Sequence, residues 1–316
     1  MRSSNVSSIK EGIWPTMLTP FDTSGAIDYR GLEQLVEWYI SNGVTGLFAV
    51  CQSSEMFFLS RQERKALASA VVQYTAGRVP VIASGHISDL LEDQRRDIVD
   101  IAETGVDAVV LVSNRLIGPD GDESDWFRNL DALLDSIPES IELGIYECPY
   151  PHKHFLTTGM LEYLGTTGRF HFLKDTVSDP NALSDRAALT GLSGMKFFNA
   201  NSATLLESLR KGYSGFSGVM ANFHPRLYRW LWDNRHDTTG KAEALQGFLG
   251  LASMIESFNY PLNAKHYLKM KGLPIEVNKR NASSFTISPS TQVLIDQLAQ
   301  QSAYWEQYVK GEEETQ

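Results

Sequence analysis

A lysine at the end of a short apolar run is the residue in this sequence best suited to chemistry. The run Phe170-His171-Phe172-Leu173 ends in Lys174, and polar turn residues and a helical pattern follow it. Short apolar runs between turn signals are typical of buried parallel strands, so we expect Lys174 at the carboxyl end of a strand. Burial lowers the pKa of an amine, and the free amine attacks carbonyl carbon. The pattern favours Schiff-base chemistry.

Two further polar residues follow predicted strands. Tyr146 ends the apolar segment 141–146, and a phenol near the lysine can relay protons while a carbinolamine forms and a carbon–carbon or carbon–oxygen bond breaks. Consecutive loop amides near Gln52 and Ser53, helped by the serine hydroxyl, could hold a substrate carboxylate. Together with the lysine, these residues fit one 2-oxo acid.

Each of these residues also has a purely structural interpretation. Lys174 could pair with Asp175 or another acidic neighbour, Tyr146 could pack with its hydroxyl in water, and serine is a routine loop residue. His152 and His154 have the spacing of one side of an extended strand, which could suggest a metal pair. No carboxylate or cysteine spacing completes such a site, so we expect no metal.

The elements that must position these residues alternate along the chain. Eight segments have strand patterns: 12–18, 46–50, 79–83, 107–112, 141–146, 170–174, 194–198 and 215–219. Helical patterns follow them at 28–43, 60–76, 88–104, 123–136, 158–164, 181–190, 202–211 and 225–234. This alternation predicts an α/β fold, a (β/α)8 TIM barrel whose active site lies at the carboxyl ends of the strands.

A doubly wound sheet is the weaker alternative. It would ordinarily carry a glycine-rich phosphate turn after the first strand, where this chain has Thr19-Pro20-Phe21-Asp22. We therefore divide the chain into an amino-terminal tail at 1–11, a catalytic barrel at 12–239 and a carboxyl-terminal helical extension at 240–316. The extension has helical patterns at 241–258, 261–271 and 289–309, and we expect it to cover the barrel or to mediate assembly.

Composition narrows the class of protein. The chain has 316 residues, is 42% hydrophobic and carries a formal net charge of −10, which argues against a nucleic-acid surface. Cys51 and Cys148 are too few for a disulfide framework, which suits a reducing compartment. The polar start of the chain does not resemble a signal peptide, and no apolar run approaches the roughly 20 residues needed to cross a bilayer. We expect a cytoplasmic enzyme without membrane partners.

These residues resemble one known family. The segment Phe172-Leu173-Lys174-Asp175-Thr176, together with Gly144-Ile145-Tyr146 and Pro149, is similar to the dihydrodipicolinate synthase/N-acetylneuraminate lyase family of class I aldolases. Five further segments match in order and spacing: Thr19-Pro20-Phe21, Asn42-Gly43-Val44-Thr45-Gly46-Leu47, Ser60-Arg61-Gln62-Glu63-Arg64, Gly105-Val106-Asp107-Ala108-Val109 and Gly215-Phe216-Ser217-Gly218-Val219. The resemblance extends from residue 12 to about residue 299.

The resemblance implies a Schiff base between Lys174 and pyruvate or a related 2-oxo acid, with Tyr146 as proton donor and acceptor. The substrate carboxylate would rest on the loop at Gln52 and Ser53. Ser217 would lie near the imine. The covalent imine would replace any metal or external cofactor, and a homo-oligomer, tetramer or dimer, would be expected.

Positions farther along the substrate are less defined. The resemblance implies that Asn201 or Ser202 meets substrate hydroxyls. Glu147, directly after the phenol, either points away from the barrel, where it is solvated or salt-bridged, or acts as an acid or binds a polyol hydroxyl. Arg115 and His86 fall in loops on the expected catalytic face, where either could hold a second anionic group.

Departures from the family pattern concern the substrate. The family loop usually reads glycine, two small hydroxyl residues, glycine and glutamate, whereas here it is Cys51-Gln52-Ser53-Ser54-Glu55. Synthases of the family carry a tyrosine pair after the fourth strand, where this chain has Val112-Ser113-Asn114-Arg115. They also carry an arginine shortly after the Tyr-x-x-Pro motif, where this chain has Tyr150-Pro151-His152. A role in lysine biosynthesis is therefore not expected.

The sequence supports three functional hypotheses. The first is a Schiff-base lyase that catalyses aldol cleavage or condensation of a hydroxylated 2-oxo acid with pyruvate as product or substrate. The second keeps the lysine imine but dehydrates a 2-keto-3-deoxy sugar acid. The third is a non-catalytic barrel that binds a 2-oxo acid, and the presence of both Lys174 and Tyr146 argues against it.

Overall fold

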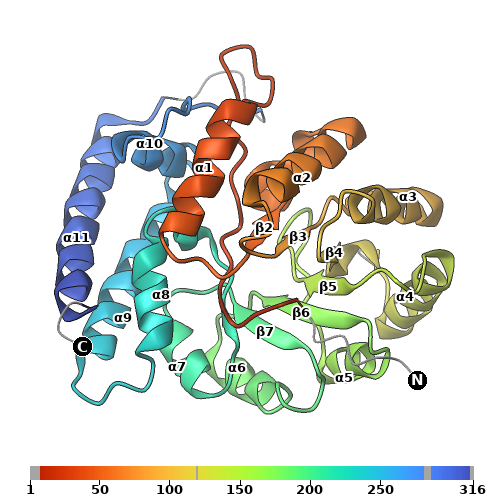
Figure 1. The fold of residues 1–316 in the computed structure, drawn as a ribbon. Coiled ribbons are helices and arrows are strands. Elements are labelled where there is room, and N and C mark those ends of the chain that lie inside the picture. The colour runs from red at the N-terminus through yellow and green to blue at the C-terminus, as the bar shows by residue number, and fades with distance from the viewer. Residues whose placement is uncertain (1–7, 119, 281–285, 314–316) are drawn as a thin grey trace.

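The computed structural model describes residues 8–118, 120–280 and 286–313. Eight parallel strands form one sheet in the order β1-β8-β7-β6-β5-β4-β3-β2, and helices surround it (Figure 1). The strands are β1 (Gly12–Ile13), β2 (Leu47–Ala49), β3 (Val81–Ala83), β4 (Ala108–Val112), β5 (Leu143–Tyr146), β6 (Phe170–Asp175), β7 (Lys196–Asn199) and β8 (Gly215–Phe216). A parallel bridge between Thr16 and Phe48 joins the two ends of the sheet. The predicted TIM barrel is confirmed.

The helices follow the strands in the predicted alternation. Those of the barrel are α1 (Tyr29–Ser41), α2 (Arg61–Thr75), α3 (Leu91–Ala102), α4 (Glu123–Ser136), α5 (Thr158–Thr166), α6 (Pro180–Ala187), α7 (Leu205–Arg210) and α8 (Pro225–Asp233). Local sequence sets their starts. Asp28 caps α1 by accepting from the Gly31 amide, and Ser60 and Glu63 form a reciprocal capping box at α2.

The strands at the seam of the barrel are shorter than predicted. β1 ends at Ile13 instead of residue 18, because Pro15 has no N–H to donate to a ladder. β8 ends at Phe216, and the chain then forms the 3₁₀ turn η4 (Val219–Asn222). At this seam the backbones approach closely: a Cβ at Gly215 would lie 1.8 Å from the Gly12 carbonyl oxygen. Only glycine fits at that position.

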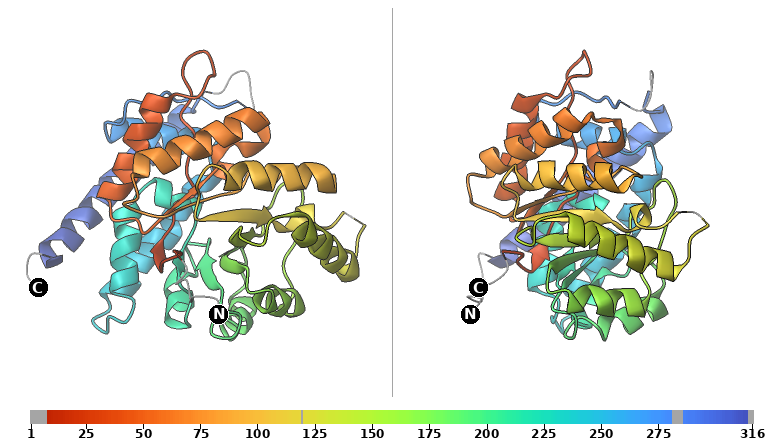
Figure 2. Two further views of the ribbon diagram at one scale, coloured as in Figure 1. Left: turned by 45° about the vertical axis from the view of Figure 1, so that its right-hand side comes forward. Right: turned by 90° about the vertical axis from the view of Figure 1, so that its right-hand side faces the viewer.

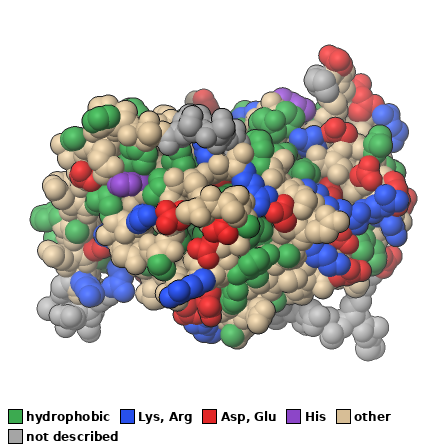
Figure 3. Space-filling view, turned by 90° about the horizontal axis from the view of Figure 1, so that it is seen from above, with side chains coloured by type: hydrophobic (Ala, Val, Ile, Leu, Met, Phe, Trp, Pro, Cys, Tyr) green, Lys and Arg blue, Asp and Glu red, His purple; other side chains and the backbone are tan. Residues whose placement is uncertain are grey.

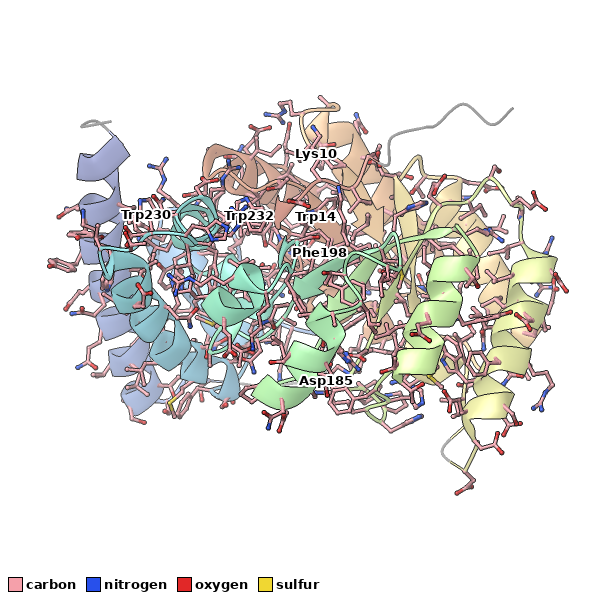
Figure 4. The ribbon with its side chains drawn as sticks, turned by 90° about the horizontal axis from the view of Figure 1, so that it is seen from below. Lys10, Trp14, Asp185, Phe198, Trp230 and Trp232 are labelled. Atoms are coloured by element: carbon pink, nitrogen blue, oxygen red, sulfur yellow. The ribbon has the colours of Figure 1, made fainter. Side chains whose placement is uncertain are left out.

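Aromatic side chains fill the interior of the barrel. The Trp14 ring centroid lies 5.6 Å from that of Phe172 and 5.9 Å from that of Phe198, and the two phenylalanines stack at 4.5 Å. Trp14 and Phe198 lie close together near the middle of the molecule (Figure 4). Because side chains alternate along a strand, Phe172 and Lys174 share the inner face of β6. The aromatic layer therefore forms the floor beneath Lys174.

The carboxyl-terminal extension packs against the barrel. It consists of α9 (Lys241–Ala252), the 3₁₀ turn η5 (Ser253–Ser257), α10 (Leu262–Met270) and α11 (Pro289–Glu313). α9 and α11 both pack against α8 (Figure 1). The turn η5 packs against η4. The side views show the extension as part of the outer helical layer (Figure 2). The predicted helix 241–258 ends at Ala252, and η5 brings the following residues toward the barrel.

One face of the molecule carries charged side chains of both signs. Acidic and basic side chains are interspersed on the face seen from above (Figure 3). Within the described ranges, no helix is both long enough and apolar enough to cross a membrane.

Candidate active site

A cavity of about 570 Å³ opens where the carboxyl ends of the strands meet. Its wall combines loops after β2, β5, β6 and β7 with the link between α9 and α10. The residues that line it are Gln52, Ser53, Glu55, Phe57, Phe58, Tyr146, Pro149, Tyr150, Lys153, Lys174, Thr176, Ser178, Ala200, Asn201, Ser202, Val219, Ser253, Glu256, Tyr260 and Pro261. Six residues considered for the site thus share one cavity: Lys174, Tyr146, Gln52, Ser53, Asn201 and Ser202.

Lys174 and Tyr146 lie side by side on neighbouring strands. They are register partners between β5 and β6, and the Lys174 Nζ lies 4.3 Å from the centroid of the Tyr146 ring. Lys174 is only 4% exposed and forms no ion pair in the described part of the chain. Burial lowers the pKa of its amine, against the weaker opposing influence of Cys51, Cys148 and Glu256. A buried amine without a carboxylate partner is poised to react as the free base.

The Tyr146 phenol is held by the loop after β2. Its hydroxyl donates to Gln52 Oε1 at 3.2 Å, and the Cys148 thiol donates to the same oxygen at 3.5 Å. The ring packs edge-on against Phe48 at 5.9 Å. Burial raises the pKa of Tyr146 well above its ordinary value. The phenol is therefore neutral and can donate its proton to a nearby oxygen.

The loop that replaces the family's glycine-containing segment forms the 3₁₀ turn η1 (Gln52–Ser54). The Ser53 hydroxyl donates to Thr16 Oγ1 at 3.1 Å, and the Ser54 hydroxyl donates to the Met17 carbonyl at 2.7 Å. The Cys51 amide donates to Ser54 Oγ at 3.1 Å. Side-chain hydroxyls thus fix the turn where the family pattern has a second glycine.

Glu55 ends this turn in the left-handed region, with φ of 59°. Non-glycine residues occupy that region at a cost, so the conformation must be held by its surroundings. One carboxylate oxygen accepts from Lys265 Nζ at 3.1 Å, and the other accepts from the Arg280 amide at 2.8 Å. The extension therefore holds the loop beside Lys174 in place.

The outer candidates divide into two groups. Asn201 and Ser202 line the cavity, and the Ser202 hydroxyl is within 2.7 Å of the Tyr228 hydroxyl. Ser217 is fully buried, lies outside the cavity lining and has no hydrogen-bond partner for its hydroxyl among the described residues. Of these three residues, Asn201 and Ser202 line the cavity and Ser217 does not.

Glu147 lies outside the cavity. Its Oε1 accepts from Arg186 at 2.7 Å and from the Leu156 amide at 2.8 Å, and its Oε2 accepts from the Thr176 amide at 3.0 Å. Arg186 also pairs with Asp175 at 2.9 Å. Both carboxylate oxygens of Glu147 are thus occupied, so we assign it a structural role in place of the substrate-binding role considered above.

His86 and Arg115 also have structural partners. His86 is buried, accepts from the Val112 amide at 3.0 Å and contacts Gln94 at 2.9 Å, and burial lowers its pKa to about 4. Arg115 pairs with Asp89 at 2.6 Å. Neither lines the cavity, so neither is placed to hold a second anionic group of the substrate.

Asn114 occupies the region where synthases carry the tyrosine pair. Its side-chain amide donates to three backbone carbonyls of the loop after β5, those of Cys148 at 2.9 Å, Tyr150 at 3.0 Å and His152 at 2.5 Å. It therefore shapes one wall of the cavity from within the same chain. In the described ranges, no three His, Cys, Asp or Glu side chains cluster as metal ligands, His152 and His154 included.

The cavity residues that were not singled out in the sequence include two titratable ones from the extension. Glu256 and Tyr260 come from the extension, which was expected only to cover the barrel. The Tyr260 hydroxyl accepts from Asn222 Nδ2 at 3.0 Å. Glu256 falls in the predicted helix 241–258 and Tyr260 in the link that follows it. Neither position indicates a catalytic role, because strand-end position marks a site residue only within the barrel repeat.

Comparison with known proteins identifies the family. The model of the dihydrodipicolinate synthetase family matches residues 10–285. The chain belongs to this family. The 4-hydroxy-tetrahydrodipicolinate synthase of Ruegeria pomeroyi is 31% identical over 218 residues, which are 69% of this chain and 72% of that protein. The corresponding synthase of Cereibacter sphaeroides is 31% identical over 217 residues, 68% of this chain and 72% of that protein.

Solved structures share the fold at low identity. YagE, a prophage protein from E. coli K12 in complex with pyruvate, has a TM-score of 0.83 at 21% identity, over 93% of this chain and 98% of its own. CdNal from Clostridium difficile, in complex with mannosamine, has a TM-score of 0.81 at 18% identity, over 92% of this chain and 99% of its own. Identities this low show the fold and leave the substrate open.

Proposed function

We propose that this protein is a lyase that forms a Schiff base between Lys174 and a 2-oxo acid, and that it cleaves or forms a carbon–carbon bond of a hydroxylated 2-oxo acid, with pyruvate as product or substrate. The observation that carries the proposal is the buried Lys174 amine, which has no ion-pair partner in the described structure and lies 4.3 Å from the Tyr146 ring. Family membership supports a lyase of this kind. The pyruvate complex of YagE supports a 2-oxo acid as ligand.

The proposed reaction begins with attack of the Lys174 nitrogen on the keto carbon. The neutral Tyr146 phenol protonates the oxygen of the carbinolamine, which leaves as water, and an iminium ion remains. The substrate carboxylate rests on the turn at Gln52 and Ser53, which lines the cavity beside both groups. The iminium then accepts the electron pair of the breaking bond, so the lysine itself replaces a metal or external cofactor.

The hydroxylated part of the substrate extends toward the outer wall. Asn201 and Ser202 line that wall and offer polar contacts for hydroxyl groups. Several residues of this site, including Gln52 and Asn114, differ from the residue pattern of the lysine-biosynthetic synthases. We therefore place the substrate among hydroxylated 2-oxo acids, such as sugar acids.

Borohydride trapping tests the proposal. Incubation of the purified protein with pyruvate and borohydride should reduce the imine and add one pyruvate-derived group to Lys174, as mass spectrometry of peptides would show. No adduct, or an adduct only on another lysine, would contradict the proposal and leave a binding barrel. With sugar-acid substrates, release of pyruvate would support cleavage of a carbon–carbon bond. A 2-oxo product with the same number of carbon atoms as the substrate would show that the reaction is a dehydration instead.

A further inference from the structure

The extension places one carboxyl group inside the cavity, that of Glu256. It lies on η5 and lines the same cavity as Lys174 and Tyr146. The turn that carries it is well anchored, because Ile255 is buried and its carbonyl accepts from Asn263 Nδ2 at 2.6 Å. Glu256 is therefore held at the mouth of the barrel by an element that contributes nothing to the sheet.

Glu256 differs from the other carboxyl groups near the site. Glu55, Glu147 and Asp175 all have cationic partners within 3.1 Å. Across residues 8–118, 120–280 and 286–313, the half-buried Glu256 carboxyl forms neither a hydrogen bond nor an ion pair with another described residue. A partly buried carboxyl costs free energy when nothing compensates its desolvation, so this group adds no evident stability.

The charged and titratable groups that interact with Glu256 come from three other places in the fold. They are Lys174 on β6, Tyr228 on α8 and Tyr260 before α10. Burial raises the pKa of Glu256 to about 7, and the Lys174 amine opposes this rise. Near neutral pH the carboxyl can therefore both accept and donate a proton, which is the condition for an efficient acid–base group.

We propose that Glu256 is the acid–base residue that takes the proton from the substrate hydroxyl at the bond to be cleaved and returns it to carbon 3 of the enamine. This inference rests on the proposed function. Two residues on different walls of the cavity would then transfer protons in different steps. Tyr146 acts while the imine forms, and Glu256 acts while the carbon–carbon bond breaks.

The proposed step conserves atoms, electrons and protons. The Glu256 carboxylate removes the proton of the hydroxyl on carbon 4, and the O–H electron pair forms the carbonyl of the departing aldehyde. The bond between carbons 3 and 4 breaks, and its electron pair forms the enamine while the iminium nitrogen becomes neutral. The Glu256 carboxyl then protonates carbon 3, and hydrolysis of the resulting imine releases pyruvate and regenerates Lys174.

The test uses pyruvate, which needs no identified aldehyde partner. Pyruvate bound as the imine exchanges its methyl protons with D₂O through the same enamine, and proton NMR measures the rate. Glu256→Gln should slow this exchange by about 10²–10⁴-fold, the range for a lost acid–base group, while borohydride trapping of pyruvate stays at the wild-type level. The wild-type rate should fall as the pH drops below about 7, and the variant should lose this dependence.

Matched measurements separate the possible failures. Glu162→Gln on the exposed face of α5 should exchange at the wild-type rate and serves as the control. Wild-type exchange in Glu256→Gln would overturn the inference, and so would loss of trapping in that variant, because the carboxyl would then serve imine formation. If the wild-type protein itself forms no adduct, the proposed function fails, and that outcome is distinct from the other two.

Discussion

Buried polar groups lie on both faces of the sheet at the carboxyl ends of strands β5 and β6. The two faces differ in whether these groups form ion pairs with other described residues. On the inner face, Lys174 has no ion-pair partner among the described residues and lies against the ring of Tyr146. On the outer face, the next residues, Glu147 and Asp175, both pair with Arg186 on α6. One residue step at the end of each strand therefore separates an amine without an ion pair in the described ranges from a buried ion-pair network.

The difference shows that burial alone does not make a residue catalytic. Both side chains are buried, and burial disfavours the charge of Lys174 and of Glu147 alike. On the outer face an arginine compensates that cost, so the groups stabilise the packing of α6 against the barrel. On the inner face no ion pair with a described residue compensates it, and the influence of Cys51, Cys148 and Glu256 is weaker than the effect of burial, so the pKa of the amine stays lowered.

The most severe test of this contrast is Lys174→Met. It should abolish pyruvate trapping and turnover while leaving the protein as stable as the wild type or more so, because it replaces an unpaired buried amine with an apolar chain of similar length. Thermal unfolding and borohydride trapping measure the two effects. Marked destabilisation would show that Lys174 belongs to a structural network like that of Arg186.

Tyr146→Phe should have the next largest effect on catalysis. Loss of the proton relay should slow turnover by about 10²–10⁴-fold, with the fold unchanged because the ring packing against Phe48 is retained. Steady-state kinetics and circular dichroism measure these effects. Unimpaired turnover would remove Tyr146 from the mechanism.

On the outer face, Arg186→Met should act on stability. It leaves Glu147 and Asp175 buried without their cation, which should cost about 3–5 kcal/mol in the free energy of unfolding. The matched control is Arg128→Met, because Arg128 pairs with Asp125 on the exposed surface of α4 and should contribute at most about 1 kcal/mol. Denaturant unfolding measures both variants. Equal stabilities would contradict the division between the two faces.

The smallest expected effect is that of Gln52→Ala. The change removes the oxygen that accepts from the Tyr146 hydroxyl at 3.2 Å, an interaction worth about 0.5–1.5 kcal/mol, so turnover should fall by up to about tenfold. If the turn binds the substrate carboxylate through its backbone amides, the KM for pyruvate should stay nearly constant. A large rise in KM would instead assign carboxylate binding to the Gln52 side chain.

The barrel repeat made much of the site predictable. Strand-end position identified Lys174 and Tyr146, and the structure brings them together because parallel strands in register align their carboxyl ends. The same rule led to Gln52 and Ser53, whereas Asn201 came from the family resemblance, and all three line the cavity. Position near a strand end did not suffice for Glu147. Side chains alternate between the inner and outer faces of the sheet, so the residue after Tyr146 points out of the cavity.

The order of elements, the barrel and the chemically important strand ends follow from the sequence itself, because strand and helix periodicities and caps are local properties of the chain. Tertiary structure alone decided which buried charges are paired, since Arg186 reaches Glu147 and Asp175 from another element. It also decided that Glu256 and Tyr260 join the cavity. These contacts depend on how the extension and helices pack, and the spacing of residues along the chain does not encode that packing.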